Sequence, residues 1–183
     1  MQRVNSMDMK RASLVKDIQL YIARASVTAS AARGQGAPGV VERARGFLGT
    51  LPLRGFGTRD ERAFKSALDR QTIRLAQALP ARGRSWGVAR KLLNIFLRNA
   101  LYTSYLRDAY GLGAAERWFE VPLDGVIARR VRSEMPGSAL PRWRGVRHVT
   151  PELSREYQEV CRQLAKVRGL APVHLDAVFW GGR

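Results

Sequence analysis

The sequence predicts an all-α protein: a compact helical domain covering residues 1–183, with a cleft between two helical lobes. Three observations support this prediction. Over residues 86–108 apolar side chains recur around most of a helix, so this stretch belongs in the middle of a domain. No long stretch alternates apolar and polar residues as a strand would. With 45% apolar residues, a chain of this length can bury about 70% of its unfolded surface.

The first helix is expected over residues 7–32, with Met9, Leu14, Ile18, Tyr21 and Ile22 on one apolar face. Glycine-rich residues 34–39 should end it. A short helix over residues 40–48 and a loop over residues 49–57 follow.

The sequence Thr58-Arg-Asp-Glu61 predicts a capping box, in which the hydroxyl and the carboxylate each satisfy a free amide at a helix start. The helix it opens should run to Pro80. Its expected core residues are Phe64, Leu68, Ile73, Leu75 and Leu79.

The stretch ARGRSWG, residues 81–87, joins this helix to the next and predicts a helix–hairpin–helix-like unit. Such a turn can point backbone amides, here at Gly87, toward a phosphate. Arg82, Arg84 and Arg90 would add positive charge around it. An ordinary helical hairpin with a solvated basic tip fits the spacing equally well.

Ser85 is the expected N-cap of the central helix, which begins at Trp86. This places Lys91 in the second turn, among apolar neighbours. Only five of the 32 cationic residues are lysines, and Lys91 lies in the most apolar stretch. A lysine can act as an amine nucleophile and an arginine cannot.

After a short helix over residues 114–119, Asp124 occupies the N-cap position of the basic helix GVIARRVRSE. A capping aspartate accepts backbone amide hydrogen bonds, and this role alone would explain the residue. Thr150 and Pro151 open a further helix that runs to Gly169. The last helix is expected from Pro172 to Trp180.

Residues 136–149 are irregular and basic, with Trp143 between Arg142 and Arg144. Interleaved aromatic and guanidinium groups suit stacking on bases and pairing with phosphates. The same tryptophan could instead close the edge of the core.

The charge is strongly positive: 32 Lys and Arg against 15 Asp and Glu give +17. This excess favours a polyanionic partner, with nucleic acid first and an acidic membrane surface second. A basic but inert surface is the alternative.

The single cysteine, Cys161, excludes a disulfide framework and a four-cysteine metal site, and its helical position predicts a core residue. His148, His174 and Asp176 lack metal-ligand spacing, so neither a metal nor a cofactor is expected. No apolar run is long enough for a membrane span, and the N-terminus lacks the features of a signal peptide. We therefore expect a cytoplasmic monomer that is nucleoid-associated when bound to DNA.

The stretch ARKLLNIFLRNALY, followed by VPLDGVIARRV, resembles the helix–hairpin–helix DNA glycosylases, and the archaeal 8-oxoguanine glycosylase branch most closely. The resemblance covers roughly Leu79 to Val131. It implies that Lys91 is the Schiff-base lysine and Asp124 the catalytic aspartate. The hairpin lacks the usual Gly-Val-Gly, no Gly-Pro-Asp triplet precedes the aspartate, and the cluster-binding cysteines of some relatives are absent.

The resemblance implies a glycosylase that excises a damaged or modified base from double-stranded DNA by attack at C1′, with or without AP lyase activity. The base would be an 8-oxoguanine-type lesion or a modified cytosine, such as glucosylated hydroxymethylcytosine in phage DNA. Trp86 and Trp180 are the candidates for the base pocket. The alternative is a non-catalytic basic helical DNA-binding protein, in which Lys91 contacts a phosphate and Asp124 is only a cap. An RNA-binding protein would also fit the charge.

Overall fold

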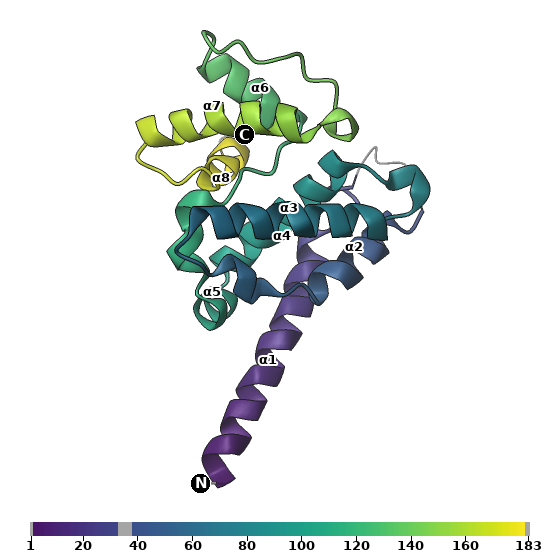
Figure 1. Ribbon diagram of the computed structural model, residues 1–183, viewed down its shortest axis with the longest axis vertical. Helices are drawn as coiled ribbons and strands as arrows, with labels where there is room; N and C mark the ends of the chain where they lie inside the picture. Colours follow the sequence, from purple (N-terminus) through teal and green to yellow (C-terminus); the bar gives the residue numbers. More distant parts are fainter. Residues whose placement is uncertain (1, 33–37, 182–183) are drawn as a thin grey trace.

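The computed structural model describes residues 2–32 and 38–181, and within these ranges the chain is helical and contains no strand, which confirms the all-α prediction (Figure 1). The glycine-rich break expected at residues 34–39 lies largely outside the described residues. The α-helices are α1 (Gln2–Ser26), α2 (Val40–Gly49), α3 (Glu61–Ala78), α4 (Trp86–Tyr102), α5 (Ser104–Tyr110), α6 (Gly125–Glu134), α7 (Pro151–Val167) and α8 (His174–Gly181). Short 3-10 turns are η1 (Leu53–Phe56), η2 (Ala81–Gly83), η3 (Leu112–Trp118) and η4 (Val146–His148).

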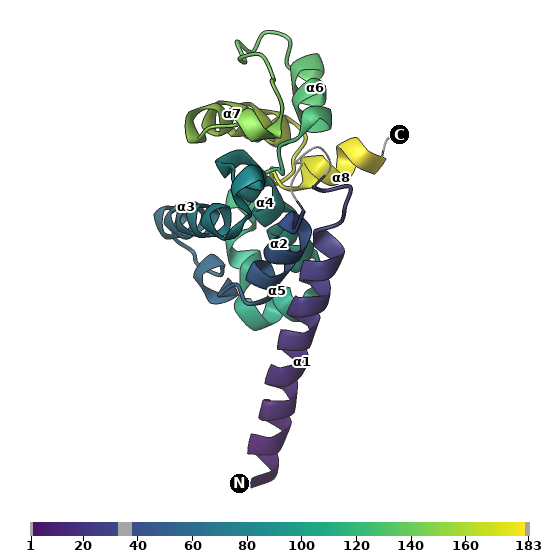
Figure 2. The ribbon, with the colours of Figure 1, turned by 90° about the vertical axis from the view of Figure 1, so that its right-hand side faces the viewer.

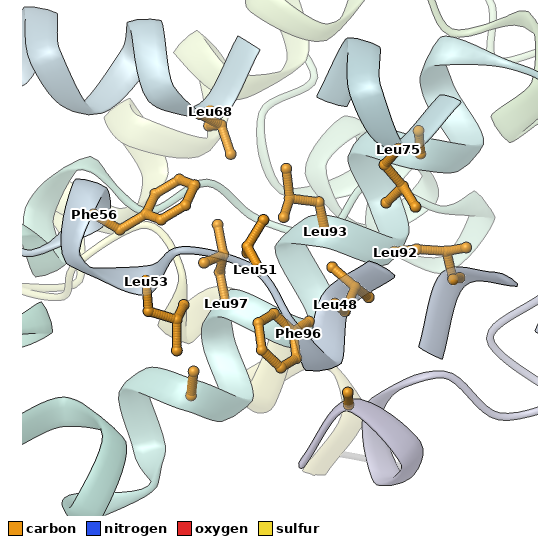
Figure 3. Close-up of a cluster of buried hydrophobic side chains, with 14 of the residues drawn as sticks. Leu48, Leu51, Leu53, Phe56, Leu68, Leu75, Leu92, Leu93, Phe96 and Leu97 are labelled. Carbon is orange, nitrogen blue, oxygen red and sulfur yellow. The ribbon is translucent and has the colours of Figure 1, made fainter. Parts of the chain in front are cut away.

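The larger hydrophobic cluster is built around α4, and α1, α2, α3 and α5 contribute to it. Figure 3 shows how leucines and phenylalanines of α3, α4 and the segment around η1 interdigitate. Leu92, Leu93, Phe96 and Leu97 lie at its centre and are almost fully buried. The central position expected for this helix is therefore confirmed.

A second hydrophobic cluster is formed by α6, α7, α8 and the segment before α6. Its buried side chains include Ile127, Tyr157 and Phe179. Cys161 is buried there too, as predicted, and burial raises the pKa of its thiol to about 12. Trp143 packs against both clusters, so it helps to join them.

The expected long helix over residues 86–108 is interrupted. Thr103 has an extended backbone, which separates α4 from α5. Its hydroxyl donates to Asn99 O at 2.8 Å, and such local bonding by threonine competes with continuation of a helix. As a result, Tyr102 and Tyr105 lie at exposed positions and not in the core.

The apolar face expected on the first helix is confirmed only in part: Ile18 and Ile22 are partly buried and pack against the larger cluster. Met9, Leu14 and Tyr21 are exposed, whereas Val15 and Gln19 face the body of the protein. Gln19 Nε2 donates to the carbonyls of Leu48 and Leu51, so a polar side chain occupies an inward position. The N-terminal part of α1 extends well away from the remaining helices (Figures 1 and 2).

Helix caps were predicted with mixed success. Ser85, Asp124 and Thr150 each accept a backbone amide hydrogen bond at the start of α4, α6 and α7, as expected. The capping box at Thr58 is wrong, because Asp60 caps α3 and accepts from Arg62 N at 2.8 Å. Thr58 instead accepts from Asp60 N, which shapes the turn before the helix. No helix in the described part of the chain is both long and apolar enough to cross a membrane.

Candidate active site

A pocket of about 510 Å³ lies between the two hydrophobic clusters. The end of α1 and the turn after it form one wall, α4 forms the floor, and α8 and the segment before α6 close the other side. These elements meet on the side of α4 that faces away from α3 (Figure 2). The lining residues come from distant parts of the sequence: Ala25, Ser26, Thr28, Ser30, Ala31, Lys91, Ile95, Arg98, Asn99, Tyr102, Pro122, Asp124, Asp176, Ala177 and Trp180.

Lys91 reaches this pocket from the second turn of α4, and its side chain is only 12% exposed. The Nζ atom donates a hydrogen bond to Ala31 O at 3.1 Å. Burial lowers the pKa of Lys91, and the nearby Asp124 carboxylate opposes this shift without cancelling it. The lysine therefore holds a larger fraction of neutral amine than a lysine in water at the same pH.

Asp124 is fixed as the N-cap of α6, where Oδ1 accepts from Val126 N at 2.8 Å and from Ile127 N at 3.0 Å. Its other oxygen, Oδ2, lies 3.9 Å from Lys91 Nζ. The side chain is 17% exposed and lines the pocket. The capping role is therefore real, but it uses only one carboxylate oxygen and leaves the other directed to the lysine.

The arrangement brings an amine and a carboxylate to the wall of a cavity that could hold a small group. An amine of lowered pKa can attack an electrophilic carbon, and a fixed carboxylate can stabilise positive charge that develops beside it. The interactions with Ala31 and Asp124 restrict the amine, so its position is fixed before any substrate enters.

Further along α4, a polar network that the sequence analysis did not anticipate lines the same pocket. Arg98 forms an ion pair with the buried Asp176 of α8. Its Nε and Nη2 atoms also donate to Asn99 Oδ1, at 3.1 and 3.0 Å. Asn99 Nδ2 in turn donates to Ser26 Oγ at 2.9 Å. Burial lowers the pKa of Arg98, which marks its guanidinium as a desolvated group.

Aromatic groups border the polar end of the pocket. Tyr102 and Trp180 both line it, and Trp180 was a predicted pocket residue. The Tyr102 ring stacks on His174, and its hydroxyl lies 2.9 Å from His174 Nδ1. His174 Nε2 lies 2.6 Å from Glu116 Oε1, so these side chains tie α8 to α4 and η3.

Trp86, the other predicted pocket residue, does not line this pocket. It borders a separate cavity beside α3 and α7, and the Arg90 guanidinium lies 5.1 Å from its ring centroid. The prediction of a shared base pocket with Trp180 is therefore wrong. The residue follows the N-cap of α4 on a different face of the helix from Lys91.

Arg90 is not an exposed phosphate contact, because its side chain is 9% exposed and its donors are already used. It makes a bidentate interaction with Glu120 at 2.8 and 2.9 Å. The remaining nitrogen, Nη1, donates to Asp69 and Thr72, both at 2.9 Å. The residue connects α3, α4 and the segment after η3, so its role is structural.

Gly87 is also wrong as an exposed amide donor, because the segment around η4 covers it. A Cβ placed at Gly87 would lie 2.1 Å from Val146 O and 2.7 Å from Val149 Cβ. The contact is reinforced by Ser85 Oγ, which donates to Arg147 O at 3.1 Å. The glycine is required for this close approach and not for binding a phosphate.

The other predicted DNA-contact residues have mixed environments. Arg82, Arg84, Arg142 and Arg144 are exposed, as a phosphate contact requires. Trp143 is partly buried and meets the Tyr157 ring edge-on, with centroids 5.4 Å apart. It therefore closes the edge of the core, which was the alternative interpretation of this residue.

Among the described residues, no group of three or more His, Cys, Asp or Glu side chains is placed to hold a metal ion. Comparison with known proteins finds no matching family model, no matching curated protein and no matching solved structure.

Proposed function

We propose that the protein is a DNA glycosylase that excises a damaged or modified base, with Lys91 as nucleophile and Asp124 as the stabilising carboxylate. The observation that carries the proposal is the approach of Lys91 Nζ to Asp124 Oδ2, 3.9 Å apart, at the wall of a pocket of about 510 Å³. The positive charge of +17 supports a polyanionic substrate.

In the first step, the neutral Lys91 amine attacks C1′ of the deoxyribose. The bond between C1′ and the base nitrogen breaks, and its electron pair leaves with the base. The lysine nitrogen loses a proton, and the departing base takes up a proton in turn. Positive charge grows on the sugar as the bond lengthens, and Asp124 stabilises it electrostatically. Because Oδ1 is fixed by backbone amides, the carboxylate needs little reorganisation.

The C1′–O4′ bond of the covalent product then breaks, O4′ takes the remaining proton of the lysine nitrogen, and an imine forms between Lys91 and C1′. Loss of a proton from C2′ expels the 3′ phosphate by β-elimination, which cuts the strand. If water attacks C1′ in place of the lysine, Asp124 accepts the proton of that water and the product is an intact abasic site. Covalent trapping distinguishes the two routes.

The base must leave the duplex stack to reach this pocket, which costs a few kcal/mol and is least costly for a base that pairs poorly. Trp180 offers an aromatic surface to a base in the pocket, whereas Arg98, Asn99 and Asp176 offer polar groups for its edge. A pocket with both kinds of group favours a base that carries extra polar atoms, as the two candidate substrate classes do.

The proposal is tested by incubating the protein with duplexes that carry a panel of modified bases, including 8-oxoguanine and glucosylated hydroxymethylcytosine. Heating in alkali then reveals abasic sites as strand breaks. On an accepted substrate, borohydride should reduce the imine to a stable protein–DNA adduct that peptide mapping places at Lys91. Lys91→Gln should abolish trapping and leave duplex affinity nearly unchanged.

Lys65→Gln is the matched control, because Lys65 lies on α3, pairs with Glu61 and does not line the pocket. It should trap as the wild type does. An adduct that maps to another amine would show that the nucleophile is misassigned. A protein that binds duplex DNA but neither releases a base nor traps across the panel would overturn the proposal in favour of a non-catalytic DNA-binding protein.

A further inference from the structure

Helix α6 carries three arginines, and the structure separates them into two kinds. Arg132 points inward, where its guanidinium donates to Leu140 O at 2.7 Å and to Tyr157 Oη at 3.2 Å. Arg129 and Arg130 are exposed, and neither forms an ion pair or a side-chain hydrogen bond within residues 2–32 and 38–181. The inward arginine holds the fold together, and the outward pair is available to a partner.

The two outward arginines border a hollow of about 340 Å³ on the face of α6, together with Val126 and Ser133. Arg129 folds back along the helix, because its Nη1 atom lies 3.4 Å from the point where a Cβ of residue 125 would be. The indole Nε1 of Trp143 lies 3.7 Å from the same point. Both distances are ordinary van der Waals contacts, so the Trp143 indole packs beside Gly125 at the edge of this surface.

Gly125 directly follows Asp124, so this surface adjoins the catalytic pair of the proposed function. At a rise of about 1.5 Å per residue, the Arg129 and Arg130 backbones lie about 7–9 Å along α6 from Asp124. Helix α6 contacts α8, which lines the pocket, and this contact holds α6 beside the pocket. Successive phosphates of one strand of B-DNA advance about 3.4 Å along the axis, so this separation spans about two nucleotides.

We infer that this α6 surface, made of Arg129, Arg130 and Ser133, binds the DNA phosphates that flank the nucleotide in the pocket. The inference rests on the proposed function, since it needs a sugar at Lys91 and Asp124. Guanidinium groups bind phosphate oxygens through paired hydrogen bonds, and the serine hydroxyl adds a donor. These contacts fix the register of the backbone without reading sequence.

The surface suits DNA backbone better than an acidic membrane. No large apolar side chain accompanies the arginines in the hollow, whereas membrane-surface helices pair a basic face with an inserted apolar one. The phosphates would also hold the extruded nucleotide in place while the base occupies the pocket. This role differs from that of Arg90, which the sequence placed at the interface and the structure places in the core.

The test uses a duplex with a tetrahydrofuran abasic analogue, which cannot be excised, so binding is measured without chemistry. For the wild type and for the double variant Arg129→Gln/Arg130→Gln, log K is plotted against log[salt]. Loss of two phosphate contacts should reduce the slope by about 1.8 and weaken binding most at low salt. The double variant Arg129→Lys/Arg130→Lys, which keeps the charge, should retain most of the slope.

The matched control is Arg70→Gln/Arg74→Gln, which removes two exposed arginines from α3 on the opposite side of α4 (Figure 2). This variant should keep the wild-type slope. Equal slopes for the wild type and the α6 variant would overturn the inference even if the wild type excises bases. A reduced slope only in the α6 variant, together with excision of no base in the panel, would leave a phosphate-binding surface but overturn its place beside a nucleotide in the pocket, so the two proposals fail in distinguishable ways. Thermal unfolding of each variant confirms that the fold is unchanged.

Discussion

In the proposed reaction, Lys91 has to meet two demands that conflict in water: it must be basic enough to attack carbon and must also be deprotonated. The fold reconciles them by burial, which lowers the pKa of its amine, while Ala31 O provides a hydrogen-bond acceptor for an N–H. Asp124 raises the pKa somewhat, so the carboxylate needed for the transition state limits how far the amine can be neutralised. The pair is a compromise between nucleophile and charge stabiliser.

The pH dependence of stability follows from this shift. The pKa of Lys91 is lower in the folded than in the unfolded protein, so between the two values the unfolded chain binds more protons. Stability from this group therefore increases as pH rises through the folded pKa toward the unfolded value of about 10.4. Lys91→Met should be more stable than the wild type near neutral pH, and urea titrations should show the advantage shrinking as pH rises. An advantage that grows with pH would contradict the assignment of burial as the main cause.

The variant Asp124→Asn distinguishes the helix-capping role of Asp124 from its proposed catalytic role. Asparagine also caps helices well, so the free energy of unfolding should fall by only a few tenths of a kcal/mol. Loss of the negative charge should slow base excision by about 10²–10³-fold, which is typical when one fixed stabilising group is removed. Single-turnover excision and thermal unfolding measure the two effects, and wild-type excision by this variant would reduce Asp124 to a cap.

At the scale of helices, predictions based on adjacent residues were the more accurate ones. Ser85, Asp124 and Thr150 were identified as caps because a cap and its amide lie within one turn. The inward position of Gln19 on α1 was missed, because its side chain is satisfied by carbonyls from another helix and its loop, which no local pattern reveals.

The same distinction applies to the candidate site. Arg98, Asn99 and Tyr102 lie on the helix face that carries Lys91, so their spacing held a signal that they line one pocket. Asp176 had no such signal, because it reaches Arg98 only through the tertiary packing of α8. Arg90 was wrongly assigned as a phosphate contact, because its partners Glu120 and Asp69 are distant in sequence. The sequence indicated its positive charge but not these ion pairs.

Arg90 provides a prediction about the contacts between helices. Arg90→Met leaves the Glu120 carboxylate, which is 14% exposed, without its cationic partner. Breaking such a pair by removing one member costs about 3–5 kcal/mol of unfolding free energy. Denaturant titration should show this loss, whereas the salt slope of DNA binding should not change. A stable variant with a reduced slope would restore Arg90 as a phosphate contact.

Gly87 tests the packing of the η4 segment on α4, and Gly46 is its control. Gly87 lies under that segment, whereas Gly46 lies on α2. Gly87→Ala places a methyl group against Val146 O and Val149, both of which must move, and should destabilise the fold by about 1–3 kcal/mol. Gly46 is exposed within α2 and a Cβ there meets nothing within 4 Å, so Gly46→Ala should stabilise it by about 0.5–1 kcal/mol. Thermal unfolding of both variants tests the prediction, and a neutral Gly87→Ala would contradict the close contact.

At the scale of the molecule, the two hydrophobic clusters and the pocket between them form one arrangement. Lys91 extends from the larger cluster, and Asp124 and Asp176 belong to elements of the smaller one. The Arg98–Asp176 ion pair, the His174 contacts and Trp143 hold the clusters together around the pocket. A cleft between lobes was expected, and the pocket occupies that position.

The final prediction concerns the net charge of +17, which should produce a strongly salt-dependent affinity for duplex DNA. Each phosphate contacted contributes about −0.9 to the slope of log K against log[salt]. If Arg82, Arg84, Arg129, Arg130, Arg142 and Arg144, which are all exposed, each contact one phosphate, the slope should approach about −5. Fluorescence anisotropy with a labelled duplex between 50 and 300 mM salt, roughly the range where such binding weakens, measures it. A slope near zero would contradict every nucleic-acid function considered for this chain, whereas a steep slope on duplex RNA and a shallow one on DNA would redirect the search to an RNA partner.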